Sequence, residues 1–113
     1  MSDETQQQME FIVEQLAVLT AKQRQYLKGL AHPLSPVVRI GKGGLTPSIA
    51  AETKRSLEAH ELIKVRIEGD DATDRREIAE QLAAESGAEL AGTIGKTAIL
   101  YRAREEKPKI KLP

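Results

Sequence analysis

The chain has 113 residues, with 17 Lys or Arg, 17 Asp or Glu, two His and no Cys. This length fits one domain with its own hydrophobic core, and the lack of cysteine excludes disulfides, thiolate metal sites and a cysteine nucleophile. The first residues lack the basic and apolar regions of a secretory signal, and no apolar run approaches the roughly 18 residues of a membrane span. We therefore expect a soluble cytoplasmic protein.

The neutral total charge conceals an uneven distribution along the chain. Residues 1–19 contain four acidic residues and no basic one, so residues 20–113 hold all 17 basic residues against 13 acidic ones. An anionic partner would therefore dock on the basic part of the chain rather than on its acidic beginning.

Residues 1–18, which we call the leader, are predicted to form a short amphipathic helix after a frayed start. Apolar residues recur at helical spacing from the leader into the next residue: Met9, Ile12, Val13, Leu16 and Leu19. The spacing is equally compatible with a helix that packs on the rest of the protein and with one that binds a partner.

The next predicted helix begins at Thr20, a good N-cap, with Gln23 three residues later as the partner in a capping box. It ends at His32-Pro33, because a residue before proline is disfavoured in the α region. We expect its apolar residues to face inward and its basic residues to lie outward or at the flank. The inward set is Tyr26, Leu27 and Leu30, and the basic set is Lys22, Arg24 and Lys28.

A short β-branched strand, residues 37–40, follows and leads into the glycine-rich turn Gly41-Lys42-Gly43-Gly44. Thr46-Pro47 then supplies an N-cap and a first helical residue. The inner face of this helix is predicted from a spacing of four residues: Ile49, Thr53 and Leu57.

The second half of the chain continues this alternation of strands and helices. Residues 62–67 alternate, with Ile63, Val65 and Ile67 on one face, and residues 73–86 read as a helix that Gly87 stops. Strands at about 88–94 and 97–102 flank a Gly95-Lys96 hairpin turn. The order α-β-α-β-α-β-β predicts a single α/β (α+β) domain, in which a four-stranded mixed sheet packs with helices.

The glycine-rich turn lies between a strand and a helix N-terminus, an arrangement that presents backbone N–H groups to an anion. A mononucleotide P-loop does not fit the spacing here, nor at Gly95-Lys96-Thr97, where Leu90 replaces its first glycine. A dinucleotide-binding fingerprint is also absent, because Thr46 replaces its third glycine. Two interpretations remain open: a tight turn that needs positive φ, and a G-x-x-G loop that clamps a nucleic-acid backbone.

Basic residues accompany this turn. Lys42 lies inside it and Arg39 precedes it, while Lys54-Arg55 follow in the next helix and Lys64 and Arg66 come from a neighbouring strand. Each alone is typical of a solvated surface charge, but several that converge on one region would favour binding of an anion.

Four stretches together resemble the CRM domain, the chloroplast RNA splicing and ribosome maturation module, in its stand-alone bacterial YhbY-type form. These are LTAKQRQYLKGLAH (19–32), PVVRIGKGGLT (36–46), HELIKV (60–65) and GKTAILYR (95–102). The resemblance extends over residues 19–113. It implies a fold similar to the C-terminal domain of translation initiation factor three, here with an extra N-terminal helix. It also implies RNA binding and association with precursors of the large ribosomal subunit.

On this resemblance the chain divides into the leader, a CRM RNA-binding domain at 19–104 and a basic C-terminal tail at 105–113. The implied RNA-binding residues are Gly41, Lys42, Gly43 and Gly44 in the loop, with Lys22, Arg24, Lys28, Arg39 and Lys96 around it. Lys54 and Arg55 are added from their position in the following helix. Arg102 also matches a family position, but a residue that closes the sheet edge would explain it equally well.

The expected partner is RNA, specifically large-subunit ribosomal RNA in precursor particles, with ribosomal proteins as further candidates. We expect a monomer with no cofactor, no metal and no membrane partner. The chain has only three aromatic residues, so recognition should rest on phosphates, shape and the 2′-hydroxyl rather than on base stacking.

Two other functions compete with RNA binding. An enzyme would have to use His60-Glu61 or the carboxylates Asp70, Asp71 and Asp74. The first pair is weak evidence, because adjacency in sequence does not make two side chains face each other. The three aspartates are explained by a turn and a helix start, which Asp favours. The alternative is a protein-interaction adaptor in ribosome assembly that acts through the leader helix, with RNA binding secondary.

Overall fold

The computed structural model describes residues 19–113, so the predicted leader helix lies outside the described residues. The described residues form three helices, α2 (Ala21–Ala31), α3 (Pro47–His60) and α4 (Ala72–Ser86). They also form four strands, β1 (Pro36–Ile40), β2 (Leu62–Ile67), β3 (Glu89–Ile94) and β4 (Thr97–Tyr101). This order confirms the predicted α-β-α-β-α-β-β arrangement.

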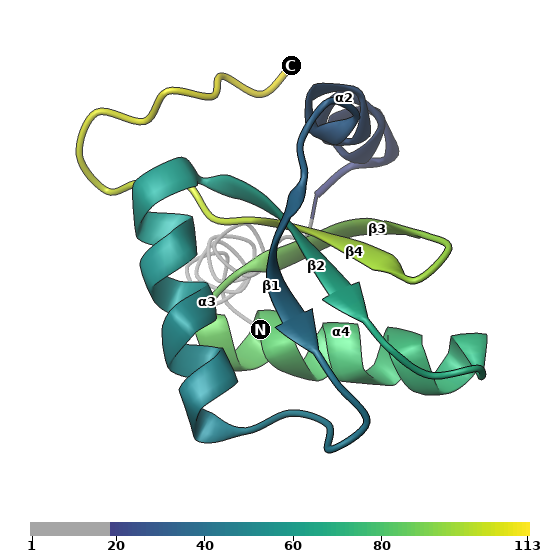
Figure 1. Ribbon diagram of the computed structural model, residues 1–113. Coiled ribbons are helices and arrows are strands. Elements are labelled where there is room, and N and C mark those ends of the chain that lie inside the picture. The colour runs from purple at the N-terminus through teal and green to yellow at the C-terminus, as the bar shows by residue number, and fades with distance from the viewer. Residues whose placement is uncertain (1–18) are drawn as a thin grey trace, which may run out of the picture.

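The strands form one mixed sheet in the order β1-β2-β4-β3 (Figure 1). β1 runs parallel to β2, while β4 is antiparallel to both β2 and β3. In the described part of the chain β1 pairs only with β2, so it is an edge strand.

Local signals set the helix ends, and those at Thr20, Thr46 and Gly87 are the ones that the sequence predicts. Thr20 and Gln23 form the capping box of α2, and the Thr46 side chain accepts a hydrogen bond from the backbone N–H of Ile49 at the start of α3. Asp71 caps α4, and Gly87 ends it in the left-handed conformation, with φ 68°. Each cap satisfies backbone groups that the helix itself leaves unpaired.

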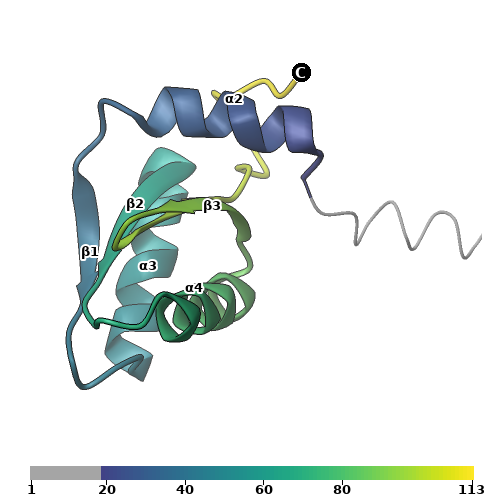
Figure 2. The same ribbon diagram turned by 90° about the vertical axis from the view of Figure 1, so that its right-hand side faces the viewer.

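Helices α3 and α4 cover one face of the sheet (Figure 2). This face contains the larger apolar core: Val38, Ile40, Leu57, Ile63, Val65, Ile67, Ala79, Leu82, Ala83, Ala98 and Leu100. The predicted alternation in β2 is therefore confirmed, because Ile63, Val65 and Ile67 all point into this core.

Helix α2 lies on the opposite face and covers only one end of it (Figures 1 and 2). A second, smaller cluster holds it there: Leu19, Leu27, Ala31, Leu62, Ala91, Ile99 and Tyr101. Two residues of the C-terminal tail, Ile110 and Leu112, pack against the same cluster. The described residues leave the other end of this face, where β1 and β2 finish, open.

The inward orientation predicted for Tyr26 and Leu30 is wrong. Their exposed fractions are 42% and 38%, whereas Leu27 and Ala31 are fully buried. Only one narrow stripe of α2 touches the sheet, and residues one position away on a helix point about 100° from that stripe. Tyr26 is thus a surface residue, while Tyr101 is buried as expected.

None of the helices in residues 19–113 has the length and apolar character needed to cross a membrane.

Candidate nucleic-acid interface

Three connections meet at the open end of the sheet: the β1–α3 loop, the β2–α4 link and the β3–β4 turn. The carbonyl oxygen of Ile40 accepts a hydrogen bond from the N–H of Glu68, at 2.9 Å. The N–H of Ile67 donates to the carbonyl oxygen of Lys96, at 2.8 Å. These two bonds bring the glycine-rich loop and Lys96 to the same edge of the molecule, although they are far apart in the sequence.

The loop itself is a tight turn in which the N–H of Gly44 donates to the carbonyl oxygen of Gly41, at 3.0 Å. Gly44 has φ 77°, a conformation that L residues with side chains rarely adopt. Gly41 and Gly43 lie outside this positive region, and a Cβ added to either would meet no atom within 4 Å. The fold therefore explains one of the three glycines and leaves the other two without a structural requirement.

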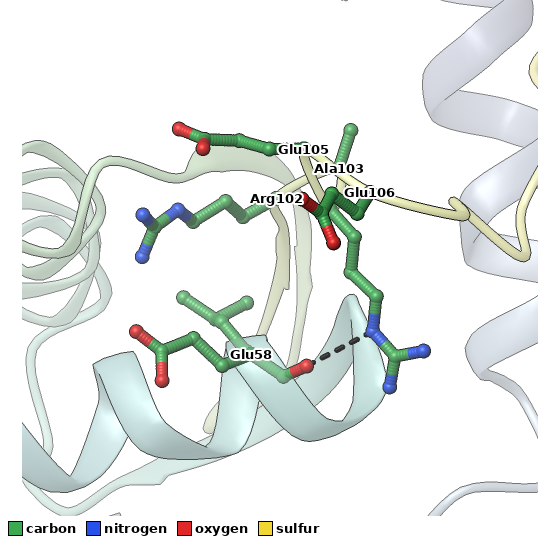
Figure 3. A pocket seen from close by; sticks show the side chains of 7 residues that line it. Glu58, Arg102, Ala103, Glu105 and Glu106 are labelled. Atoms are coloured by element: carbon green, nitrogen blue, oxygen red, sulfur yellow. Dashed lines mark hydrogen bonds between the residues drawn. The ribbon is translucent and has the colours of Figure 1, made fainter.

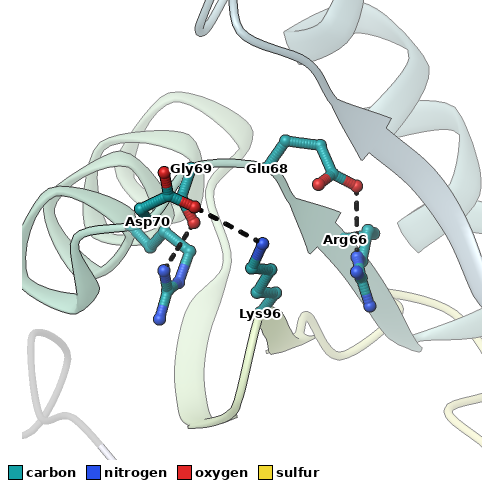
Figure 4. A network of polar contacts seen from close by, with 6 residues as sticks. Arg66, Glu68, Gly69, Asp70 and Lys96 are labelled. Atoms are coloured by element: carbon teal, nitrogen blue, oxygen red, sulfur yellow. Dashed lines mark hydrogen bonds and ion pairs between the residues drawn. The ribbon is translucent and has the colours of Figure 1, made fainter.

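Cationic side chains flank the loop along the sheet. Lys42 and Arg39 are exposed, and Arg39 pairs in register with Arg66 of β2. Arg66 Nε lies 3.2 Å from Glu68 Oε1, and Lys96 Nζ lies 4.0 Å from Asp70 Oδ1 (Figure 4).

Within residues 19–113, neither Arg39 nor Lys42 forms an ion pair. Arg66 and Lys96, by contrast, already share their charge with a neighbouring carboxylate. Arg39 and Lys42 are therefore the cations at this end of the sheet that are most available to an anionic ligand.

Lys54 and Arg55 are exposed on α3, the helix that begins just after the loop. Both residues lie about 10 Å along the helix axis from Pro47, and thus about two helical turns away from the loop. Helix α3 covers one face of the sheet, and Arg39 lies on the other face. The loop therefore lies between Arg39 on one side and Lys54 and Arg55 on the other.

The structure does not bring the basic residues of α2 to the loop. Lys22 and Arg24 lie in the first turn of a helix that covers the far end of the sheet, and Arg24 Nη1 donates to the carbonyl oxygen of Leu19, at 2.6 Å. Lys28 reaches over the sheet, where its side chain occupies the space that a Cβ at Gly92 would need. The predicted basic residues thus fall into a loop group and an α2 group.

Lys64 has a structural role that the sequence did not reveal. Its Nζ donates to the carbonyl oxygens of His32 and Leu34, at 3.1 and 2.9 Å. These carbonyls follow the C-terminal end of α2, where a cation is electrostatically favourable. Arg102 has a similar role at the end of α4, because its Nη1 lies 3.5 Å from the carbonyl oxygen of Ser86.

Glu61 is the polar residue that sequence analysis missed most clearly. It is completely buried, and its carboxylate accepts hydrogen bonds from the backbone N–H groups of Lys109, at 2.5 Å, and Arg104, at 3.3 Å. Burial alone would raise the pKa of Glu61, but the backbone N–H groups of Lys109, Arg104 and Ile110 and the charge of Arg104 together lower it. Burial and the charge of Glu61 raise the pKa of Tyr101.

A cavity of about 320 Å³ lies between the end of α3 and the start of the tail, lined by Glu58, Arg102 and Arg104 among others (Figure 3). Arg104 lines this cavity and donates to the carbonyl oxygens of Glu58, at 3.0 Å, and Ala59. The arginine therefore satisfies the free carbonyls at the end of α3. The hydrogen bonds of Glu61 and Arg104 together hold the tail against the domain. Backbone N–H groups occupy the Glu61 carboxylate.

The other carboxylates considered for catalysis have local structural roles. Asp71 Oδ1 accepts hydrogen bonds from the N–H groups of Thr73 and Asp74, at 2.8 and 3.0 Å. His60 is the last residue of α3. In the part of the chain that the structure describes, no three His, Asp or Glu residues lie close enough to hold a metal ion.

Comparison with known proteins identifies the module. Residues 19–102 match the family model of the CRS1 / YhbY (CRM) domain. A Haemophilus influenzae protein named "RNA-binding protein" is 45% identical over 98 residues, which cover 87% of this chain and 98% of the relative. The "Probable RNA-binding protein YqeI" of Bacillus subtilis is 38% identical over 96 residues, covering 85% of this chain and all of the relative.

A solved structure agrees with this result. The solution structure of a hypothetical protein from Staphylococcus aureus superimposes with a TM-score of 0.77 at 38% identity, over 85% of this chain and all of that chain. The fold, the glycine-rich loop and the match over residues 19–102 lead to one conclusion: this chain is a member of the CRS1/YhbY (CRM) domain family.

Proposed function

We propose that this chain binds RNA, and that the loop Gly41–Gly44 grips the RNA backbone. The observation that carries the proposal is the presence of glycine at positions 41 and 43, where neither backbone conformation nor crowding requires it. Missing side chains at an exposed loop allow a phosphate to approach the backbone closely. The two relatives described above, which are named as RNA-binding proteins, support the same partner.

The loop offers several groups that suit a phosphate. Within residues 19–113 the N–H groups of Lys42 and Gly43 donate no hydrogen bond, so both are free to bind an oxygen anion. The N-terminus of α3 adds a partial positive charge directly after the loop. Lys42 and Arg39 then supply two full charges, and no carboxylate of the described residues pairs with either of them.

This arrangement recognises the RNA backbone rather than base identity. The loop contains no aromatic side chain on which a base could stack, and Tyr101 is buried in the smaller apolar cluster. Phosphate contacts position a protein on RNA but carry little sequence information. Sequence preference must therefore come from RNA shape or from groups outside the loop.

The RNA we assign is large-subunit ribosomal RNA in precursor particles, and the function is assistance in ribosome assembly without a catalytic step. This assignment follows the CRM resemblance, in which ribosome maturation is the bacterial role. The protein acts as a cytoplasmic monomer, and the basic residues of α2, Lys22, Arg24 and Lys28, provide a second contact with an RNA that extends along the sheet.

The test compares two charge reversals, Lys42→Glu in the loop and Lys107→Glu in the tail, after both variants are shown to fold. We expect Lys42→Glu to weaken binding to a large-subunit ribosomal RNA fragment about tenfold or more, because it removes and repels one phosphate contact. Lys107→Glu carries the same change of charge at an exposed position earlier in the tail, outside the loop and the basic residues of α2. Equal affinity of the two variants in fluorescence anisotropy would contradict the loop as the binding element.

Ribosomal association needs a separate measurement. Tagged protein in a lysate should sediment with immature large subunits at low salt, and nuclease treatment should release it. Lys42→Glu should shift the protein to the soluble fraction at a lower salt concentration than the unaltered chain. Sedimentation with transfer or messenger RNA instead would leave RNA binding intact and refute the ribosomal assignment.

A further inference from the structure

An apolar groove lies at the α2 end of the molecule, away from the glycine-rich loop. It has a volume of about 500 Å³ and lies between the end of α2, the edge strand β1, the start of β2 and the tail. The exposed fractions of Leu30, Leu34 and Val37 are 38%, 40% and 46%, so the groove is open to a ligand. Its apolar lining residues are Leu30, Leu34, Val37, Leu62, Ile63 and Ile110.

The size of the groove favours a ring-sized group over a segment of another protein. Sites for small molecules are clefts of about 300–1,000 Å³ with mostly apolar walls and a few polar groups. One turn of a helix, about 10–12 Å wide and about 5.4 Å long, would already fill a groove of this volume. A specific protein interface covers about 800 Å² on each partner, which is far more than one helical turn provides. A flat heterocycle with its sugar fits the groove better.

The charge around the groove favours an anionic ligand. None of the described residues that line it is acidic, and the carboxylate of neighbouring Glu61 is buried and bound by backbone N–H groups of the tail. Lys64 Nζ donates to the carbonyl oxygen of Leu34, at 2.9 Å, and so lies beside the groove. Exposed Lys109 directly precedes Ile110 in the tail. Apolar walls with cations at the rim suit a nucleotide, which joins a base to a phosphate.

The strand β1 connects the groove to the glycine-rich loop, because it runs from one to the other (Figure 1). Val37 and Arg39 are exposed and alternate with residues of the larger core, so both lie on the opposite face of the sheet. Val37 in the groove lies about 13 Å before Gly41 in the loop, with Arg39 between them. An RNA strand bound at the loop can therefore follow β1 to the groove and keep its phosphates near Arg39.

We propose that the groove holds an unpaired base of the RNA whose backbone is bound at the loop. The inference rests on the RNA binding proposed above and adds that the RNA is single-stranded at this point, because a base inside a duplex is stacked and paired. The exposed polar side chains of Ser35 and His60 line the groove and offer hydrogen bonds to the edge of the base. The groove thus supplies the base contacts that the loop lacks.

Two RNA strands of equal length test this assignment. One is an unstructured single strand, and the other is the same ribose-phosphate chain made of stable abasic units. Both carry the same phosphates, so the loop group contacts them equally. In fluorescence anisotropy we expect the intact strand to bind at least about fivefold more tightly, which is the low end of the range for a base on a stacking surface.

Leu34→Gln and Ile94→Gln are a matched pair of uncharged variants. Leu34 is 40% exposed in the groove, and Ile94 is 57% exposed on β3 outside it, so neither change alters the core or the charge. Leu34→Gln should bind the intact strand about threefold more weakly, because the base loses apolar contact area, and should bind the abasic strand as before. Ile94→Gln should keep the affinity ratio of the unaltered chain.

NMR locates the base without any substitution. The side-chain methyl signals of Leu30, Leu34 and Val37 should shift when the intact strand is added, and should stay in place with the abasic strand. The methyl signals of Ile94 should respond alike to both strands, because this residue lies outside the groove. This readout also covers the case in which Leu34→Gln fails to fold.

The possible failures are distinguishable from one another. Equal affinity for the two strands, with Lys42→Glu weakening both, would overturn the groove assignment and leave the loop contact in place. Binding of neither strand would refute the RNA binding itself, and the groove assignment with it. Groove signals that shift when the protein alone is concentrated would assign the groove to a second copy of the chain, and this result would also overturn the proposal.

Discussion

The carboxylate of Glu61 accepts a hydrogen bond from the backbone N–H of Lys109, which lies 48 residues later in the chain, at 2.5 Å. The same carboxylate accepts a second bond from the N–H of Arg104, at 3.3 Å. Because Glu61 lies in the link between α3 and β2, these bonds fasten the tail to the middle of the fold. The tail is therefore held in place by a buried charge as well as by the apolar contacts of Ile110 and Leu112.

Replacement of Glu61 should destabilise the protein. Glu61→Gln keeps the size of the side chain but removes the charge that accepts the backbone N–H groups, and hydrogen bonds to charged groups contribute about 1.5–3 kcal/mol each. We expect the free energy of unfolding in urea to fall by about 2 kcal/mol. Glu58→Gln is the matched control, since its side chain is exposed on the same helix and only its backbone oxygen bonds Arg104. Equal stabilities of the two variants would refute the role of the buried carboxylate.

The same residue should make stability depend on pH. The folded state lowers the pKa of Glu61 below its ordinary value of 4.5, so the folded protein favours the ionised form. The resulting stabilisation is fully present above pH 4.5 and is lost as the pH falls through the lower pKa of the folded state.

The measurement is urea unfolding of the unaltered chain and of Glu61→Gln, from about pH 7 to about pH 3. The difference between the two free energies should shrink on acidification, because other carboxylates contribute to both proteins alike. A difference that stays constant over this range would assign the effect of the substitution to packing rather than to charge.

Most of the fold could be predicted from the sequence because its signals are local. Thr20, Thr46 and Gly87 define helix ends through contacts within a few residues, and alternation within residues 62–67 identifies the buried face of β2. The faces of α2 could not be predicted in this way. Leu27 and Ala31 are buried, rather than Tyr26 and Leu30, because of where the sheet lies against the helix, and no local pattern specifies that.

The roles of polar residues at the site were harder to predict for a related reason. Lys64 finds its partners 30 and 32 residues earlier in the chain, and Glu61 finds its partners more than 40 residues later. Composition reveals that such residues are charged but not what they touch. The three loop glycines likewise look equivalent in the sequence, and only the backbone angles separate Gly44 from the other two.

This separation predicts different effects for three alanine substitutions in the loop. Gly44→Ala should lower the free energy of unfolding by about 1–2 kcal/mol, because φ 77° is unfavourable for a residue with a Cβ. Gly41→Ala and Gly43→Ala should leave it unchanged or raise it by up to about 1 kcal/mol, since alanine restricts the unfolded chain. The proposed RNA contact predicts that these two stable variants nevertheless bind RNA more weakly, because each methyl group keeps a phosphate away from the backbone.

Urea unfolding and RNA titration of the same three preparations distinguish these effects. Loss of stability in Gly41→Ala or Gly43→Ala would mean that the fold requires all three glycines. Full RNA affinity in both variants would remove the argument for close backbone approach, whatever their stability.

Substitutions of Arg39 and Lys64 should affect different properties: the change at Lys64 should lower stability, and the change at Arg39 should weaken RNA binding. Lys64→Met removes the donor that satisfies the carbonyls of His32 and Leu34, so we expect a loss of about 1 kcal/mol in stability and little change in RNA affinity. Arg39→Met should leave stability within about 0.5 kcal/mol, because an exposed side chain is lost, and should weaken RNA binding. Thermal unfolding and anisotropy measured on both variants test this, and a loss of RNA affinity in Lys64→Met alone would reverse the assignment.

The salt dependence of RNA binding should report how many phosphates the loop group contacts. Each phosphate neutralised by a basic side chain releases counterions, so the slope of log K against log salt concentration changes by about 0.7–0.9 per contact. Lys42→Gln should therefore reduce the magnitude of the slope by about one unit, and the double variant Arg39→Gln with Lys42→Gln by about two. Lys107→Gln, the matched neutralisation outside the loop and α2, should leave the slope unchanged. If Lys107→Gln reduced the slope as much as Lys42→Gln does, the contact would be a diffuse attraction to the whole basic surface, and the loop would have no special position in the interface.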